Sequence, residues 1–152
     1  MRFACAGSMR TQHDGRSDTG RRPHNEDGWL GVAERGLFAV TDGMGGYEGG
    51  EIASRIALSS LESYFDLLGD DGLGLGPDGH AVARERMALA LRMADREVAR
   101  QATGRLAQMG TTVAALAIQN GFALIAHVGD NRVYRLREGA LEALTRDHSL
   151  QA

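Results

Sequence analysis

The 152-residue sequence lacks several features that would each indicate a class of protein. It has one cysteine, Cys5, so no disulfide can form within the chain, which fits a reducing compartment. No stretch approaches the roughly 18 apolar residues of a membrane-spanning helix, and the N-terminus has no apolar run typical of a secretory signal. The net charge of −3 provides no large positive field. We therefore expect a cytoplasmic protein without nucleic-acid or membrane partners.

The rest of the composition is typical of one globular domain. Hydrophobic residues make up 43% and charged residues 24% of the chain, and its length allows one sizeable core. There is no internal repeat. The glycine- and aspartate-rich stretch 69–79 is too short to separate domains, so we predict a single domain over residues 1–152.

Hydrophobic spacing predicts a mixture of strands and helices. The stretch 111–118 is apolar on both alternating faces, which favours a strand covered on both sides. Asn120-Gly121 is a strong hairpin signal. The predicted strands are 29–32, 37–41, 111–118, 122–128, 133–136 and 141–145, with an edge strand at 3–9, and the predicted helices are 51–68 and 81–103.

An apolar strand that ends at Asp42 is followed closely by Gly43, Gly45, Gly46 and Gly49. No Gly-Lys-Ser/Thr follows, and Glu48 stands where a dinucleotide fingerprint has its third glycine. The Asp42 carboxylate and the Gly43 carbonyl are oxygen ligands, which favour magnesium or manganese over zinc. The alternative is a tight turn before a helix.

A second polar cluster precedes the first predicted strand. Pro23 disfavours a helix there, so the cluster reads as a loop. Arg22 is a candidate phosphate clamp, and Glu26 and Asp27 are candidates for holding metal-bound waters. If the strands 29–32 and 37–41 pair antiparallel, both acids lie near Asp42. The alternative is a solvated loop with a surface Arg–Glu pair, worth about 0–1 kcal/mol.

Asp130 follows another predicted strand. It either closes a turn with Arg132 paired to it, or it faces the same cleft as Asp42 if both strands end at one edge. Cys5 has no recognisable partner base, so the sequence does not support a cysteine nucleophile.

Together these segments resemble the metal-dependent serine/threonine protein phosphatases of the type 2C class (PPM family), in their bacterial form. The matches occur in family order along nearly the whole chain. They are Ser17-Asp18-Thr19-Gly20, Arg22 with Asn25-Glu26-Asp27, Val40-Thr41-Asp42-Gly43-Met44-Gly45-Gly46, Gly49 with Glu51 and Ala53-Ser54, Met109-Gly110-Thr111-Thr112, His127-Val128-Gly129-Asp130-Asn131-Arg132-Val133-Tyr134, and Leu144-Thr145-Arg146-Asp147-His148-Ser149.

The resemblance implies an α+β fold, a four-layer α-β-β-α sandwich of two antiparallel sheets flanked by helices. It also implies two Mn²⁺ or Mg²⁺ ions, with a third, more weakly held ion in bacterial members. Asp42 matches the carboxylate that bridges two metals, and Arg22 matches the phosphate-binding arginine. The positions that match metal ligands or holders of metal-bound water are Glu26, Asp27, Asp42, Gly43 and Asp130.

The implied reaction is hydrolysis of phosphoserine or phosphothreonine in proteins by a metal-activated water, with Asp42 and Arg22 as catalytic residues. Met44 stands where many eukaryotic members have a histidine that protonates the leaving group. Two later acidic motifs of the family do not occur in these 152 residues, so we predict the N-terminal portion of a catalytic domain, incomplete at its C-terminus.

The partners implied by the resemblance are phosphorylated proteins, including a serine/threonine kinase or its substrates. The alternative function is a catalytically incomplete module that binds phosphoprotein or another partner. Open strand edges would also allow self-association.

Overall fold

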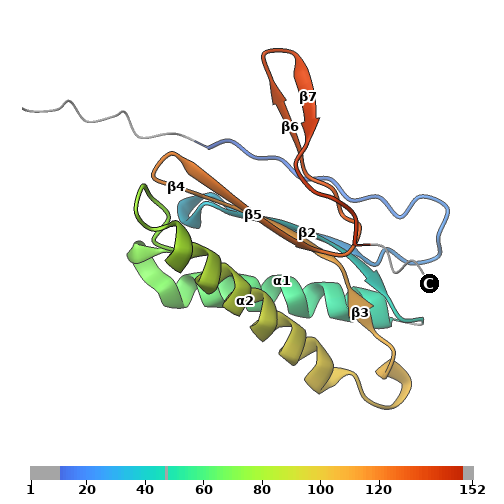
Figure 1. Cartoon of the computed structure of the whole chain (residues 1–152). Coiled ribbons are helices and arrows are strands. Elements are labelled where there is room, and N and C mark those ends of the chain that lie inside the picture. The colour runs from blue at the N-terminus through green and yellow to red at the C-terminus, as the bar shows by residue number, and fades with distance from the viewer. Residues whose placement is uncertain (1–10, 47, 149–152) are drawn as a thin grey trace, which may run out of the picture.

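The computed structural model describes residues 11–46 and 48–148, so the strand predicted at 3–9 lies outside the described residues. Figure 1 shows one main sheet with two long helices beneath it and a separate hairpin. The strands and helices are β1 (Asp27–Val32), β2 (Leu37–Met44), α1 (Gly49–Leu68), α2 (His80–Gln101), β3 (Gly110–Thr111), β4 (Val113–Gln119), β5 (Phe122–Val128), β6 (Tyr134–Arg137) and β7 (Ala140–Ala143).

The main sheet is antiparallel, in the order β1-β2-β4-β5, with β3 paired to the end of β2. Asn120 and Gly121 join β4 to β5 with φ values of 54° and 80°, the positive values that a two-residue type I′ turn requires. Because β2 and β5 are both antiparallel to β4, they run in the same direction and end at the same edge. β1 begins at that edge, since Asp27 pairs in register with Asp42.

Several strands differ from their predicted extents, and two of these differences shape the acidic edge. β2 continues to Met44 rather than ending at 41, so Asp42 and Gly43 lie inside it. The predicted strand 111–118 is divided into β3 and β4 at Thr112. In a regular ladder the Asp42 amide would donate to a backbone carbonyl of the neighbouring strand. Here it donates instead to the hydroxyl of Thr112, which lies opposite. A distant side chain therefore shapes both strands.

The two long helices pack on one face of the sheet and on each other (Figure 1). Both occur within two residues of their predicted bounds. Their apolar stripes meet the inward-facing side chains of β2 and β4, as helical spacing requires. The largest fully buried apolar side chains are Leu37, Leu61, Leu73, Leu75 and Met87. No helix within 11–46 and 48–148 combines the length and the apolar character needed to cross a membrane.

The opposite face of the sheet is less completely covered than predicted for 111–118. The segment before β1 crosses it, with Gly15 against the Trp29 indole and His13 against the Phe38 ring, whose centroid is 5.3 Å away. Leu116 is only partly buried on this face. The sequence pattern indicates burial of both faces, but the described residues supply helices for one face only.

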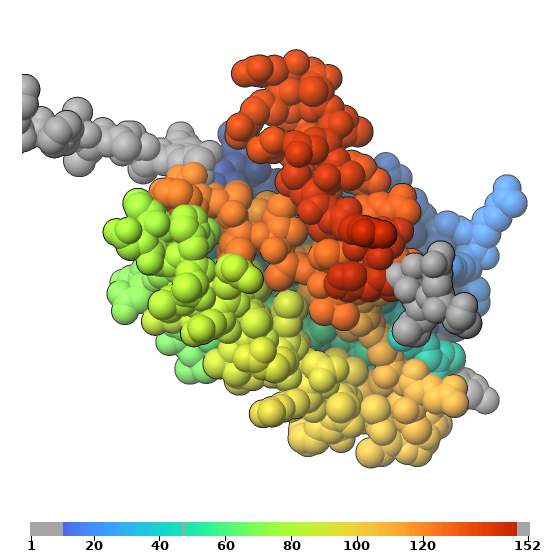
Figure 2. Space-filling view, in the orientation of Figure 1, coloured from blue at the N-terminus to red at the C-terminus, as the bar shows by residue number. Residues whose placement is uncertain are grey.

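The β6–β7 hairpin forms a second antiparallel sheet of two strands. It projects from the face of the main sheet opposite to the helices, and it stands clear of the body in the space-filling view (Figures 1 and 2). Its turn residues Glu138 and Gly139 have φ values of 52° and 78°, and Leu136 and Leu141 are exposed. Two antiparallel sheets and two helices make the α+β composition that the sequence predicts.

Candidate metal centre

Two carboxylates face one another where β1 begins and β2 approaches its end. Asp27 and Asp42 are direct cross-strand partners, and both side chains lie on the sheet face away from the helices. They line a cavity of about 240 Å³ together with Arg16, Ser17 and Asn131. The predicted proximity of residue 27 to Asp42 is therefore present in the structure.

The electrostatics of Asp42 show which other charges reach this edge. Partial burial raises its pKa, and the negative charges of Asp27 and Asp130 raise it further. The positive charge of Arg22 acts in the opposite direction. The charges of Asp27, Asp130 and Arg22 are thus near enough to act on Asp42, and the repulsion among the acids would be relieved by a bound cation.

Arg22 lies in the turn that follows Thr19, whose carbonyl accepts a hydrogen bond from the Arg22 amide at 3.2 Å. In the part of the chain that the structure describes, no carboxylate lies within 4.0 Å of its guanidinium. The surface Arg–Glu pair considered from the sequence is not present. A guanidinium near acidic residues, yet not paired with them, suits a dianionic ligand such as phosphate.

Glu26 reaches the same edge from the other side of the sheet. Its carbonyl accepts a hydrogen bond from the Gly43 amide at 3.1 Å. Its carboxylate lies against Gly50 in the first turn of α1, where a Cβ on Gly50 would come within 2.5 Å of Oε1. A Cβ on Gly43 would overlap the Gly50 carbonyl oxygen. Both glycines therefore permit the helix N-terminus, which favours negative charge, to approach Glu26.

The loop that carries Asp130 is fastened on two sides. Asn131 donates from Nδ2 to the Val40 carbonyl at 3.3 Å, which ties the loop to β2. Arg132 donates from Nε and Nη2 to the Asp147 carboxylate, at 2.9 and 2.6 Å. The Asp130–Arg132 pair considered from the sequence is therefore wrong, and the alternative that Asp130 faces the Asp42 edge agrees with the effect of its charge on Asp42.

Sequence reasoning assigned no role to three hydroxyl residues of this edge. Thr112 binds both backbone groups of Asp42. The Thr112 hydroxyl accepts a hydrogen bond from the Asp42 amide at 3.0 Å, and the Thr112 amide donates to the Asp42 carbonyl at 2.9 Å. Ser54 donates to the Glu26 carbonyl, and the Thr111 hydroxyl lies 3.1 Å from the Asp42 carbonyl. All three occur in the matched motifs, but only the tertiary structure shows what they bind.

The donor set fits a hard divalent cation. Within residues 11–46 and 48–148, no three or more histidine, cysteine, aspartate or glutamate side chains converge as a metal-holding group. Among the predicted ligands, the strand register brings the Asp27 and Asp42 carboxylates together. Oxygen donors that are few in number suit Mg²⁺ or Mn²⁺, because these ions retain several waters, and they do not suit zinc.

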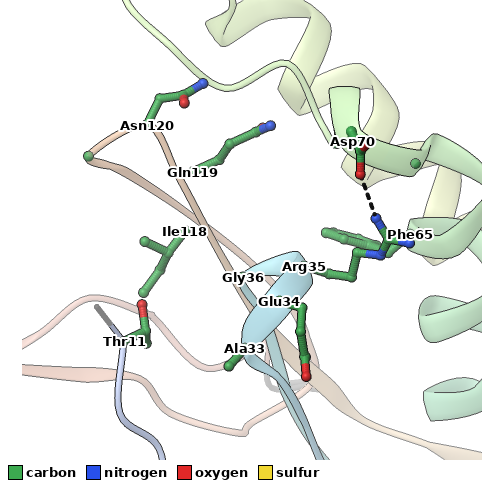
Figure 3. A pocket seen from close by; sticks show the side chains of 13 residues that line it. Thr11, Ala33, Glu34, Arg35, Gly36, Phe65, Asp70, Ile118, Gln119 and Asn120 are labelled. Carbon is green, nitrogen blue, oxygen red and sulfur yellow. Dashed lines mark ion pairs between the residues drawn. The ribbon is translucent and has the colours of Figure 1, made fainter. Parts of the chain in front are cut away.

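A larger cavity, of about 680 Å³, lies at the other end of β2 (Figure 3). Arg35 lines it, with Nε 3.4 Å from Asp66 and Nη1 3.5 Å from Asp70. Gly36 and Ile118 place it at the start of β2 and the end of β4. It is separated from the acidic edge by the length of the sheet, and its arginine already faces two carboxylates.

Comparison with known proteins agrees with this site. The model of the protein phosphatase 2C family matches residues 14–151. The chain belongs to the protein phosphatase 2C family. Among characterised proteins, it is 36% identical over 135 residues to the serine/threonine protein phosphatase PstP of Mycobacterium tuberculosis, covering 87% of this chain and 24% of PstP. It is 34% identical over 146 residues to the serine/threonine phosphatase stp of Listeria welshimeri, covering 89% of this chain and 54% of that protein.

Solved structures of protein phosphatase 2C relatives share the fold. The PstP catalytic domain, solved in complex with two manganese ions, superposes with a TM-score of 0.73 at 35% identity, over 89% of this chain and 55% of that one. PppA of Pseudomonas aeruginosa gives a TM-score of 0.66 at 32% identity, over 89% and 55%. The family and the α+β fold class inferred from sequence are confirmed. The chain spans about half the length of these structures.

Proposed function

We propose that this chain is the N-terminal part of a catalytic domain that hydrolyses phosphoserine and phosphothreonine in proteins. The observation that carries the proposal is the register pair of Asp27 and Asp42, with the charges of Arg22 and Asp130 acting on it. Two relatives bearing the name serine/threonine phosphatase support the same reaction class.

In this proposal Asp42 and Asp27 hold one or two Mn²⁺ or Mg²⁺ ions, the Gly43 carbonyl is a further ligand, and Glu26 orients coordinated water. Asp130 holds a third ion less firmly, because it stands in a loop rather than in the strand pair. When bound, such ions supply the positive charge that lowers the pKa of a water molecule and stabilises negative oxygens around phosphorus.

Arg22 binds the phosphate of the substrate. Its guanidinium offers paired N–H donors to two phosphate oxygens, and the charge it contributes is needed most when negative charge builds up in the transition state. Met44 is exposed, and its thioether has no proton to give to the leaving group. Protonation of the leaving serine or threonine oxygen therefore falls to water in this proposal.

The substrates in this proposal are phosphorylated proteins, among them a serine/threonine kinase or its targets. Arg22 and the acidic residues lie at the exposed ends of the strands rather than in a closed pocket. This arrangement suits a phosphorylated side chain carried on a protein surface. A cytoplasmic location is part of the same proposal, because phosphorylated kinases and their targets are found there.

The test is Mn²⁺-dependent hydrolysis of p-nitrophenyl phosphate and of a phosphothreonine peptide by the purified protein. We expect turnover that EDTA abolishes and that Asp42→Asn removes. Arg22→Ala should lower kcat/KM by about 100-fold, the typical effect of losing one donor to transition-state charge. Arg21→Ala is the matched control, since it removes an adjacent exposed arginine whose charge is not among those acting on Asp42, and it should leave turnover nearly unchanged.

Turnover that persists in EDTA, or that Asp42→Asn leaves intact, would contradict the proposal. Binding of the phosphothreonine peptide without any Mn²⁺-dependent turnover would instead favour the alternative of a phosphoprotein-binding module. Equal losses in Arg21→Ala and Arg22→Ala would show that the arginines act through general charge rather than through a phosphate contact.

A further inference from the structure

Two hydroxyl side chains lie directly beneath the acidic edge, that of Ser54 buried and that of Thr111 partly buried. Ser54 of α1 is 2% exposed, and its Oγ donates to the Glu26 carbonyl at 2.7 Å. The same oxygen lies 3.0 Å from Oγ1 of Thr111 in β3. Thr111 Oγ1 is in turn 3.1 Å from the Asp42 carbonyl. The two hydroxyls thereby connect the residue before β1, the end of β2, β3 and the first turns of α1.

The protons available fix the direction of these hydrogen bonds. A carbonyl only accepts, so the single Ser54 proton points to Glu26. Thr111 also has one proton, and it faces Ser54 Oγ at 3.0 Å, the Asp42 carbonyl at 3.1 Å and the Thr112 carbonyl at 3.0 Å. Because Ser54 gives its proton to Glu26, a hydrogen bond between the two hydroxyls has Thr111 as its donor. The single Thr111 proton is then divided among Ser54 Oγ, the Asp42 carbonyl and the Thr112 carbonyl.

Other bonds also act on the spacing between Glu26 and Asp42, because Asp27 pairs in register with Asp42 and Thr112 bonds to both backbone groups of Asp42. The ladder between β2 and β4 ends at Val40 and Ala114, and β3 pairs only with Gly43 and Met44. Beyond Asp27, β1 continues only through the bond from the Gly43 amide to the Glu26 carbonyl. The strand ends that carry the acids are thus held by these bonds together with the hydroxyl pair that lies under them.

We propose that Ser54 and Thr111 are positioning residues that set the separation of the Glu26 and Asp42 backbones, and through it the spacing of the carboxylates that receive the cation. The hydroxyls bond to backbone carbonyls and to each other, so the effect on the carboxylates is transmitted through the backbone. The proposal rests on the proposed function for the identity of the cation, but not for the hydrogen bonds themselves.

The variants test the loss of the hydroxyl group separately from a change in side-chain shape. Thr111→Val keeps the shape and removes the hydroxyl, while Thr111→Ser keeps the hydroxyl. Ser54→Ala removes the second hydroxyl. Ser59→Ala is the matched control, because Ser59 is in the same helix and its hydroxyl donates only to the Ile56 carbonyl at 3.1 Å.

The first measurement is the Mn²⁺ dissociation constant, obtained from the electron paramagnetic resonance signal of free Mn²⁺. Thr111→Val and Ser54→Ala should weaken binding by about 10-fold or more, as loss of outer-shell hydrogen bonds does at other metal sites. Thr111→Ser and Ser59→Ala should stay within about twofold of the unsubstituted protein, since both retain the pair.

The second measurement is hydrogen exchange of the Gly43 amide without metal, which reports the bond to Glu26 directly. The Gly43 amide should exchange faster in Thr111→Val and Ser54→Ala. Its exchange rate should be unchanged in Thr111→Ser and Ser59→Ala. Unchanged exchange in Thr111→Val would overturn the proposal, as would equal weakening of Mn²⁺ binding by Thr111→Ser and Thr111→Val. If the unsubstituted protein bound no Mn²⁺, the proposed function would fail, while the Gly43 amide would still decide the positioning proposal.

Discussion

Asp42 is expected to lower the stability of the metal-free protein, so replacing it should raise stability while removing metal binding. In Asp42→Asn the side chain keeps its shape and loses its charge, which removes the repulsion with Asp27 across the strand pair. Like charges directly opposite one another in a sheet cost roughly 0.2–1 kcal/mol. Because Asp42 is largely solvated, we expect a gain near the middle of that range, about 0.5 kcal/mol.

The pH dependence of this gain has a definite sign. The folded protein holds the pKa of Asp42 above its ordinary value of 3.8, through burial and the charge of Asp27. Below pH 3.8 the carboxyl is neutral in both folded and unfolded protein, so Asp42→Asn should then match the unsubstituted protein. As the pH rises through the raised pKa, the unsubstituted protein loses stability that the variant keeps.

The assay is thermal unfolding followed by circular dichroism in EDTA, with Asp42→Asn, Asp27→Asn and the double variant. A gain of about 0.5 kcal/mol corresponds to roughly 1–2 °C in a chain of this size. Each single variant removes the same repulsion, so the double variant should gain less than the sum of the two. With Mn²⁺ at about 100 times its dissociation constant the unsubstituted protein should gain about 2.7 kcal/mol, which reverses the order.

Two results would refute this reasoning. One is a metal-free Asp42→Asn protein that is less stable than the unsubstituted protein at neutral pH. The other is strict additivity of Asp27→Asn and Asp42→Asn, which would mean that the two carboxylates do not interact. Either outcome would also remove the physical argument that a cation relieves repulsion at this edge.

Gly43→Ala should destabilise the protein by about 1–3 kcal/mol in urea unfolding, because its Cβ would overlap the Gly50 carbonyl oxygen; an unchanged midpoint would contradict that packing. Leu61→Ala should cost about 2–5 kcal/mol in the same assay, because Leu61 is fully buried, and a loss below about 1 kcal/mol would show that the core collapses around it. The pKa of Glu97, lowered to about 2 by hydrogen bonds from Arg100 and Gln101, should rise toward 4.5 in Arg100→Gln when followed by NMR. The associated stability is present above the ordinary pKa and lost as the pH falls through the lowered one; a pKa that stays near 2 would rule out the Arg100 contact as its main cause.

Local sequence determined most of the secondary structure of this protein. Helical spacing placed α1 and α2 within two residues of their observed bounds, and Asn120-Gly121 predicted the β4–β5 turn that the structure contains. These features depend on side-chain periodicity and on the φ preferences of single residues, and a short stretch of sequence determines both. The motif order also identified the protein phosphatase 2C family, because several spaced motifs coincide only in relatives.

The tertiary structure alone decided the features that depend on partners distant in the chain. β2 extends to Met44 because β3, nearly 70 residues later, pairs with its end, and the strand predicted at 111–118 divides because Thr112 binds the Asp42 backbone. Arg132 binds Asp147 rather than the nearer Asp130. The sequence named the acids of the candidate site, but the contacts that hold their spacing, those of Ser54 and Thr111, exist only once four elements have come together.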